Sequence, residues 1–340
     1  MTNPVVVEVL RGERVESAHR GAGAVVDAHG RVAFAFGDID RPVYPRSAVK
    51  ALQALPLIES GAADLLGLTE TEIALACASH SGEDEHVALA SAMLARAGRD
   101  ESVLECGAHW PLGEAASRAL ARSDRSPGAL HNNCSGKHAG FVCVACVSGI
   151  EPTGYVAWDH PVQREVTAAL AEVTQARLDG ETRGVDGCSI PTYAIPLRAL
   201  AHGFARFATG QGLSPGRAKA AARIRAAVAA HPSVVAGAGR FDTEVMTILG
   251  PRAFTKTGAE GAYCAALPEL GLGLAVKVDD GGGRAAQAMV AALLRRFGGF
   301  DEASSRRLRP FAAPRLVNWS GLEVGALRPA GPLEYIGSRQ

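Results

Sequence analysis

The chain has 340 residues, of which 47% are hydrophobic, and its 35 Lys plus Arg balance 35 Asp plus Glu. This composition is typical of a folded globular protein with a substantial core. Because no basic surplus is available to hold a polyphosphate, it argues against nucleic-acid binding and favours a small substrate. Residues 1–11 lack the features of a signal peptide, and no run of about 18 uncharged apolar residues occurs. Secretion and membrane spanning are therefore not expected.

The seven cysteines are odd in number and irregular in spacing. They do not form the framework of a disulfide-rich secreted domain, so we expect a cytoplasmic protein with free thiols. Cys143 and Cys146 lie in an apolar helical run and are expected to be core, as are Cys77, Cys106 and Cys264.

In chain order, strand patterns at residues 5–10 and 22–27 come first, and a turn at residues 27–30 leads to a returning strand at 32–36. Residues 48–60 have helical periodicity, and Pro56 is expected to kink or shorten that helix. A capping box at residues 69–72 begins the next helix. Further helices are predicted at residues 86–97, 113–122, 134–150, 162–173, 196–209 and 215–230.

The C-terminal part returns to strands at residues 261–267 and 272–278, followed by an amphipathic helix at 284–297. Residues 127–133 are expected to be a loop. Since strands come from both ends and no repeat or low-complexity linker occurs, we predict one α/β domain over residues 1–340, with a helical region at about residues 45–250.

Ser47, Ala48, Val49 and Lys50 form an S-x-x-K tetrapeptide. A spacing of three places both polar side chains on one helical face, close enough for a hydrogen bond. Lysine can take the serine proton only when its amine is neutral, which requires burial or a nearby positive charge. The tetrapeptide by itself is common, and a helix start with a solvated lysine is the alternative interpretation.

Two further segments follow in a meaningful order: residues 79–81 (Ser-His-Ser), and residues 256–258 (Lys-Thr-Gly) just before a predicted strand. Penicillin-binding proteins and class A β-lactamases have S-x-x-K, a serine loop and K-T-G in this order, across one cleft between helices and a sheet edge. The middle segment lacks the asparagine of S-D-N, so β-lactam chemistry is not expected. The pattern indicates a cleft with two serines and two lysines, in which each lysine lowers the pKa of the other.

Four longer segments carry a family resemblance: residues 131–141 (HNNCSGKHAGF), 186–191 (DGCSIP), 239–243 (GRFDT) and 256–261 (KTGAEG). Together they closely resemble the rhizobial-type, or class 3, L-asparaginase family. The resemblance implies a serine β-lactamase/glutaminase-like fold, an α/β sandwich of a mainly antiparallel sheet with helices on its faces plus a helical subregion. It also implies hydrolysis of L-asparagine to L-aspartate and ammonia by a homodimer.

The resemblance assigns the catalytic roles residue by residue. Ser47 is similar to the family's nucleophile and Lys50 to its general base. Ser79 and Lys256 resemble a second serine–lysine pair that supports the first and relays protons.

The resemblance also implies a zinc site made by Cys134, Lys137 and Cys188 beside the substrate pocket. Its remaining pocket residues are Asp186, near the zinc site, and Arg46 and His80, which flank the two serines. Zinc is expected to order the pocket and bind the substrate rather than activate water. By side-chain type alone, His138 would be the favoured third ligand instead of Lys137, because neutral lysine amines rarely bind zinc.

Two other functions are compatible with the same residues. One is another serine–lysine acyl-transfer enzyme, such as a glutaminase or a cytoplasmic peptidase, which would differ in the depth of its pocket. The other is a zinc-dependent protein that binds small amino acids without catalysis.

Overall fold

The computed structural model describes residues 2–334. The main sheet consists of β1 (Val5–Arg11), β2 (Arg14–Asp27), β3 (Val32–Phe36), β8 (Phe254–Thr257), β9 (Ala262–Leu267), β10 (Leu272–Val278), β11 (Arg315–Val317) and β12 (Glu323–Pro329). Its order is β11-β12-β1-β2-β10-β9-β8, with β3 also paired to β2, and every pair is antiparallel. Both ends of the chain therefore supply the sheet, as predicted.

Four short strands lie outside the main sheet: β4 (Pro42–Val43), β5 (Arg183–Val185), β6 (Pro191–Tyr193) and β7 (Ile195–Pro196). They form two small antiparallel sheets, β4-β7 and β5-β6. The second of these sheets ends next to Asp186, one of the expected pocket residues.

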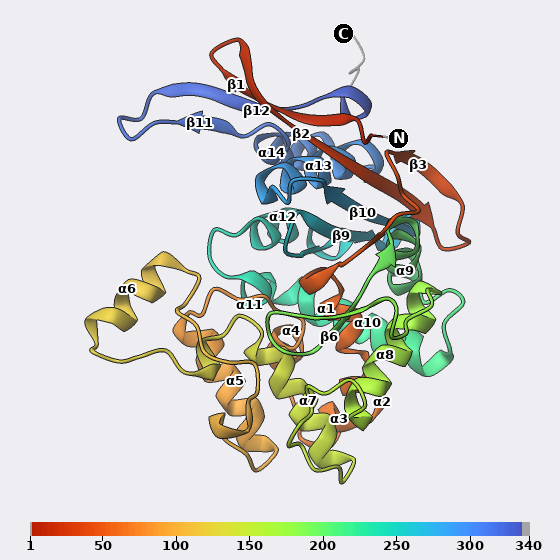
Figure 1. Cartoon of the computed structure of the whole chain (residues 1–340), viewed down its shortest axis with the longest axis vertical. Coiled ribbons are helices and arrows are strands. Elements are labelled where there is room, and N and C mark those ends of the chain that lie inside the picture. The colour runs from red at the N-terminus through yellow and green to blue at the C-terminus, as the bar shows by residue number, and fades with distance from the viewer. Residues whose placement is uncertain (1, 335–340) are drawn as a thin grey trace.

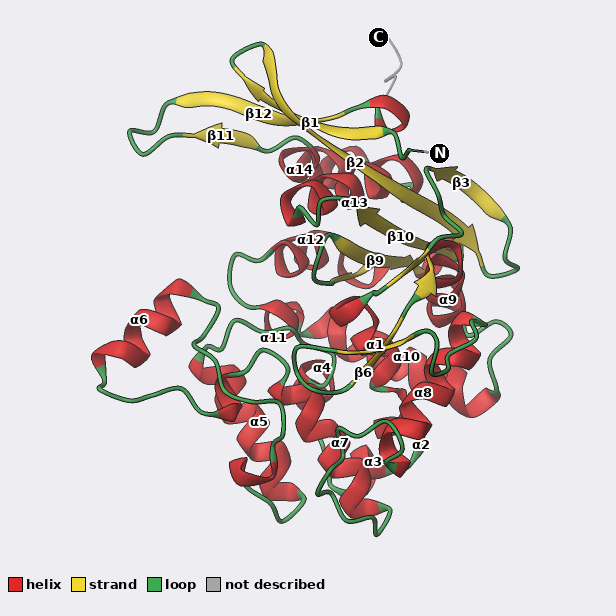
Figure 2. Cartoon of the chain, viewed as in Figure 1, coloured by secondary structure: helices red, strands yellow, loops and turns green. Residues whose placement is uncertain are grey.

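The helices are α1 (Lys50–Gln53), α2 (Leu55–Glu59), α3 (Ala62–Leu65), α4 (Glu70–Leu75), α5 (Asp84–Arg96), α6 (Glu114–Arg122), α7 (Ser135–Val147), α8 (Pro161–Thr174), α9 (Leu197–Thr209), α10 (Pro215–Ala230), α11 (Pro232–Ala236), α12 (Phe241–Leu249), α13 (Gly283–Phe297) and α14 (Glu302–Ala312). Most of those from α1 to α11 gather into a helical region below the sheet, and α12 to α14 lie beside the sheet (Figures 1 and 2). Within residues 2–334, no helix has the length and apolar character needed to span a bilayer.

Alternation along the strands divides the interior into two hydrophobic cores. On β2, Ala24 and Val26 belong to the core shared with the helical region, whereas Val25 belongs to the core shared with α12, α13 and α14. The same alternation occurs on β10, where Ala275 faces the helical region and Leu274 faces α13. The mainly antiparallel sheet with helices on both faces, plus a helical subregion, confirms the predicted fold class.

Small residues on the sheet let α9 approach its backbone closely. A Cβ added at Gly273 on β10 would lie 2.0 Å from the carbonyl oxygen of Ala201 and 2.3 Å from the amide nitrogen of Ala205, both on α9. Backbone atoms cannot rotate away as a side-chain end can. The position therefore requires glycine for packing.

Replacing Gly273 by alanine is expected to destabilise the protein by about 3 kcal/mol, because α9 must move off the sheet. Urea unfolding followed by circular dichroism measures the change. Gly216→Ala in the first turn of α10 is the matched control, since its added methyl group meets no atom within 4 Å. The control should keep or slightly raise the stability. Equal midpoints for both variants would contradict this account of the contact.

The predicted helix at residues 48–60 is broken into three pieces. A 3₁₀ turn at Arg46–Val49 leads into α1, and α2 begins after Ala54 with Pro56 in its first turn. Proline fits there because its missing N–H has no partner in a first helical turn. The shortening expected from Pro56 is confirmed, as is the capping box of Thr69 and Glu72 at the start of α4.

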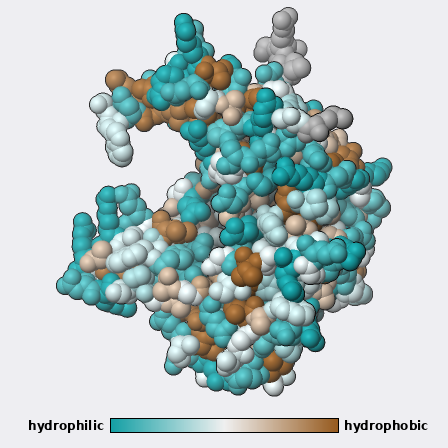
Figure 3. Space-filling model, viewed as in Figure 1, coloured by the Kyte–Doolittle hydropathy of each residue, from teal (hydrophilic) through white to brown (hydrophobic). Residues whose placement is uncertain are grey.

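Two parts of the chain project on the same side of the molecule, and the surface between them is hollowed (Figure 3). One is the hairpin of β11 and β12, which exposes Val317 and Leu322 on either side of a fully exposed Trp319. The other is α6, which buries only Leu120.

Candidate active site

Three distant segments place two serines and two lysines at the junction of sheet and helices. Ser47 lies in the 3₁₀ turn, Lys50 begins α1, Ser79 follows α4, and Lys256 is on β8. The Oγ of Ser79 is 3.0 Å from the Nζ of Lys50 and 2.8 Å from that of Lys256. Lys50 is 1% exposed and Lys256 is completely buried. Ser79 therefore joins the two lysines, so that three of the four groups expected from sequence are in direct contact.

Glycine at the third position of the Lys-Thr-Gly segment explains how β8 meets the 3₁₀ turn. A Cβ at Gly258 would lie 2.4 Å from the carbonyl oxygen of Pro45. Only a residue without a side chain lets the backbone before Ser47 come this close to β8. Lys256 and Thr257 end β8, a strand that was not predicted, and the segment lies just before the predicted strand, which is β9.

Ser47 and Lys50 do not form the hydrogen bond that their spacing suggested. The amine of Lys50 instead donates to the carbonyl oxygen of Ala78 at 2.5 Å, to Ser79 and, at 3.4 Å, to the carbonyl oxygen of Asn133. Three oxygen acceptors match the three protons of an ammonium group. The half-buried Ser47 makes no side-chain hydrogen bond. Of the two serines, Ser47 is more accessible than the buried Ser79.

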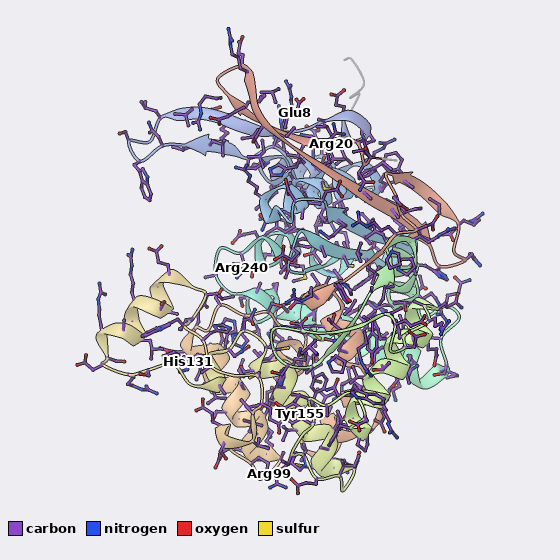
Figure 4. The ribbon with its side chains drawn as sticks, in the orientation of Figure 1. Glu8, Arg20, Arg99, His131, Tyr155 and Arg240 are labelled. Carbon is purple, nitrogen blue, oxygen red and sulfur yellow. The ribbon has the colours of Figure 1, made fainter. Side chains whose placement is uncertain are left out.

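Burial lowers the pKa of Lys256 to about 7. Asp242 acts in the opposite direction, whereas the positive charges of Lys50 and Arg240 lower the pKa further. The expected influence of one lysine on the other is present at Lys256. Arg240 lies in the loop leading into α12, between the sheet and the helical region (Figure 4). Near neutral pH, Lys256 can therefore accept a proton.

A second cluster contains two thiols and a lysine. The Nζ of Lys137 is 3.0 Å from the Sγ of Cys188, and Cys134 and Cys188 share a hydrogen bond. The neighbouring His138 turns away, with its Nδ1 2.7 Å from the hydroxyl of Tyr155. The structure thus places Lys137, not His138, beside the two sulfurs.

The protonation of this cluster follows from its contacts. The hydrogen bond between the two cysteines lowers the pKa of Cys134 and raises that of Cys188. Burial opposes the charge of Lys137, but the two cysteines outweigh it and raise its pKa. The buried amine and the two sulfurs therefore shift one another's pKa values.

The donor types in the cluster fit a zinc ion. Two sulfurs and a nitrogen converge, and the Sγ of Cys188 is 3.9 Å from a carboxylate oxygen of Asp186. Sulfur and nitrogen ligands are those that zinc prefers. Across residues 2–334, no group of three or more His, Cys, Asp and Glu side chains is placed to hold a metal. A zinc ion at the cluster would therefore need the amine of Lys137, deprotonated, as a ligand.

An ion pair joins two predicted pocket residues. The guanidinium of Arg46 donates to both carboxylate oxygens of Asp186, at 2.9 and 3.3 Å. Burial would raise the pKa of Asp186, but Arg46 and Lys137 outweigh it and hold that pKa below its usual value. Arg46 also lines a cavity of about 290 Å³ together with Tyr44 and Glu260. Paired opposite charges at an open cavity suit a zwitterionic ligand.

Backbone strain collects at the same site. Arg46, Ser189 and Glu260 have φ angles of 52°, 77° and 55°. Residues other than glycine rarely adopt this left-handed conformation, and where they do it often marks a functional site. Each of the three lies next to a predicted site residue or lines the cavity.

His80 has a different setting from the other predicted pocket residues. Its ring is completely buried and bonds to the hydroxyl of Ser135 at 2.9 Å and to the amide of Gly82 at 3.1 Å. It also stacks on His86. With its ring nitrogens occupied, His80 can act on a ligand only through its neighbours.

Two contributors to the site were missed by the sequence analysis. The carbonyl oxygen of Asn133 accepts from Lys50, and Asp242 lies behind β8. The composition held one unused signal, because the chain has only five lysines among its 35 basic residues, and Lys50, Lys137 and Lys256 are three of them. A sequence that otherwise uses arginine retains lysine where the charge must be lost or moved.

The buried hydroxyl of Ser79 bridges two lysine amines, and one of these lysines has a pKa of about 7. Such a site is suited to proton transfer in acyl chemistry. Residues 7–329 match the L-asparaginase II family, and the chain belongs to that family. It is accordingly a hydrolase of the asparaginase type. A search of curated proteins gives no match.

Two solved structures are similar to the chain. A β-lactamase from Mycobacterium bovis has 17% identity over 82% of this chain and 95% of its own, with a TM-score of 0.41. A proposed β-lactamase from Bacteroides dorei has 14% identity over 76% of this chain and 84% of its own, with a TM-score of 0.38.

Proposed function

We propose that the protein is an L-asparaginase that hydrolyses L-asparagine to L-aspartate and ammonia with Ser47 as nucleophile. The observation that supports it is the line Lys50–Ser79–Lys256, in which one hydroxyl joins two buried amines. Ser47, three residues before Lys50, is half-buried, whereas Ser79 is 3% exposed. A nucleophile has to reach the substrate, so the accessible serine attacks and the buried serine conducts protons.

The proton path follows from the hydrogen bonds of Lys50. Because Lys50 donates to three oxygens, it has to release a proton before it can take one from Ser47. Ser79 connects it to Lys256, whose pKa of about 7 allows protonation near neutrality. As Ser47 attacks the amide carbon, its proton moves to Lys50, and a proton of Lys50 moves through Ser79 to Lys256.

The same path works in reverse to complete the reaction. The departing nitrogen takes the proton back and leaves as ammonia, so that the substrate remains as an ester on Ser47. Water then adds to this ester and gives a proton to the lysines, and aspartate is released as the lysines return that proton to the Ser47 oxygen. Each lysine returns to its starting state, and one water molecule is consumed.

Recognition of the substrate is assigned to Arg46 and Asp186. Asparagine carries a carboxylate and an ammonium group on its α-carbon. Arg46 offers a forked donor for the carboxylate, and Asp186 offers an acceptor for the ammonium. The ion pair that joins them in the structure would open to bind the two substrate charges.

A zinc ion held by Cys134, Lys137 and Cys188 would lie beside this pocket. When bound, zinc would supply a positive charge that orders the cluster and attracts the carboxylate of the substrate. Asp186 would support the site from outside, because it lies against Cys188 and is oriented by Arg46. No proton transfer in the proposed reaction requires the metal.

Cys188→Ser is expected to lose zinc, because the cluster would keep only one strong sulfur ligand. Protein equilibrated with zinc and freed of excess metal should contain about one zinc per chain in the wild type and about one tenth of that or less in the variant. Metal analysis by mass spectrometry measures the ratio. Cys146→Ser, at a half-buried cysteine outside the cluster, is the matched control. Equal zinc content in both variants would show that Cys188 is not a ligand.

The function is tested by ammonia release from asparagine and from glutamine, each with and without a zinc chelator. The proposal expects turnover of asparagine well above that of glutamine. Preference for glutamine would assign the chain to the glutaminase alternative. Binding of either amino acid without ammonia would indicate the zinc-dependent binding protein.

Two consequences of the family resemblance also stay predictions, the homodimer and the cytoplasmic location. Light scattering coupled to size-exclusion chromatography tests the first. A mass close to 35.2 kDa, that of a single chain, would contradict it.

A further inference from the structure

We propose that Asp242 is a positioning residue that holds Lys256 in place from the opposite face of β8 and keeps its amine able to take up a proton. The importance of Asp242 for catalysis rests on the proposed function, in which Lys256 accepts a proton. The placement of Asp242 is independent of it.

Asp242 is 2% exposed and lies in the first turn of α12. One carboxylate oxygen accepts from the hydroxyl of Thr255 at 2.9 Å and from the hydroxyl of Tyr263. The other accepts from the amide nitrogen of Thr257 at 3.1 Å. Asp242 therefore binds the residues before and after Lys256, and Tyr263 pairs with Thr257 across the sheet.

Asp242 and the Lys256 side chain lie on opposite faces of β8. Side chains alternate along a strand, so Lys256 points to the helical region with Phe254, while Thr255 points to the face covered by α12. Tyr263 belongs to the core on the α12 face. Asp242 thus acts on Lys256 through the strand and does not touch Ser79 or the cavity.

The charges around Lys256 make Asp242 its main source of negative potential. Burial disfavours the ammonium form, and Asp242 is the first group that opposes this effect. The positive charges of Lys50 and Arg240 act on Lys256, and three cysteines also interact with it electrostatically. The charged and titratable groups that face Lys256 are Asp242, Arg240, Lys50, Cys134, Cys77 and Cys264.

The test is a direct titration of Lys256. The chain has only five lysines, at positions 50, 137, 219, 256 and 277, so protein labelled with ¹³C at the lysine ε-carbon gives a simple spectrum. Lys256→Met identifies the resonance. In Asp242→Asn, we expect the pKa of Lys256 to fall by about one unit or more, because the opposing negative charge is gone. A pKa within about 0.3 units of the wild-type value would overturn the proposal.

Tyr263→Phe provides a second variant with the opposite sign. It keeps the ring and the carboxylate but removes one donor, so the charge of Asp242 is less compensated and the pKa of Lys256 should rise by a few tenths. A purely structural role would not reverse the shift between the two variants. If Asp242→Asn fails to fold, this variant decides alone, and an unchanged or lowered pKa overturns the proposal.

The titration needs no turnover, so it separates this inference from the proposed function. A wild-type chain that releases no ammonia, combined with the expected pKa shifts, rejects the asparaginase activity and retains the role of Asp242. Normal turnover with an unmoved Lys256 pKa rejects the role of Asp242 and retains the activity. If the chain is active and Asp242 has the proposed role, the decrease of kcat/KM at low pH should shift in each variant in the same direction as the pKa of Lys256.

Discussion

Ser47→Ala is expected to reduce ammonia release from asparagine by about 10⁴-fold or more, since removal of a nucleophile leaves only binding and electrostatic contributions. Its stability should change by no more than about 0.5 kcal/mol, because the Ser47 hydroxyl makes no hydrogen bond that alanine would break. Steady-state ammonia assays and urea unfolding measure the two effects. Loss of activity without loss of stability is the signature of a group that serves only the reaction.

Ser79→Ala is the matched comparison, because it removes the hydroxyl of the second serine of the site. Here we expect a smaller loss of activity, about 10²-fold, since a proton relay is interrupted and the nucleophile remains. The cost in stability should be larger, about 1–3 kcal/mol, because two buried amines lose a shared acceptor. If Ser79→Ala were the inactive variant and Ser47→Ala kept its turnover, the assignments of nucleophile and relay would be exchanged.

Lys256→Met is expected to lower kcat/KM by about 10²- to 10⁴-fold, the range typical of a lost acid–base group. In the wild type, Lys256 is neutral above its pKa of about 7 and cationic below it. Only the neutral form accepts a proton, so kcat/KM should fall about tenfold for each pH unit below that pKa. The residual activity of Lys256→Met should lack this acid limb.

The control for this change is Lys219→Met, at an exposed lysine of α10. It removes the same charge from the chain without touching the site, and it should keep the wild-type pH profile. A wild-type rate that stays flat from about pH 5 to about pH 8 would contradict the role of Lys256 as proton acceptor. So would an unchanged acid limb in Lys256→Met.

Local patterns predicted the elements whose composition favours one kind of secondary structure. The helix expected at residues 215–230 coincides with α10, and the strand expected at residues 272–278 coincides with β10. α10 is rich in alanine, and β10 is a continuous apolar run that is buried on both faces, so each segment carries its own signal. The buried positions of Cys77, Cys106, Cys143 and Cys264 also agree with the expectation, whereas Cys146 is half-buried.

Other elements exist mainly because of what they contact. Helices α11, α12 and α14 and strands β8, β11 and β12 were not predicted, and most of them are short. α12 spans nine residues, has no side-chain cap, and is held by Asp242 bonding to β8. Segments of this length gain most of their stability from tertiary packing, which a local pattern does not contain.

The sequence by itself determined the chemistry available: two serines, two lysines and two cysteines in an order that resembles one family, and the helices and strands that carry them. Tertiary structure decided how these groups combine. It paired Lys50 and Lys256 with Ser79 and left Ser47 unbonded, and it turned Lys137 toward Cys188. The physical reason is that hydrogen bonding and pKa depend on burial and on neighbours far along the chain. Ser79 and Lys256 are 177 positions apart in the sequence and meet only in the folded protein.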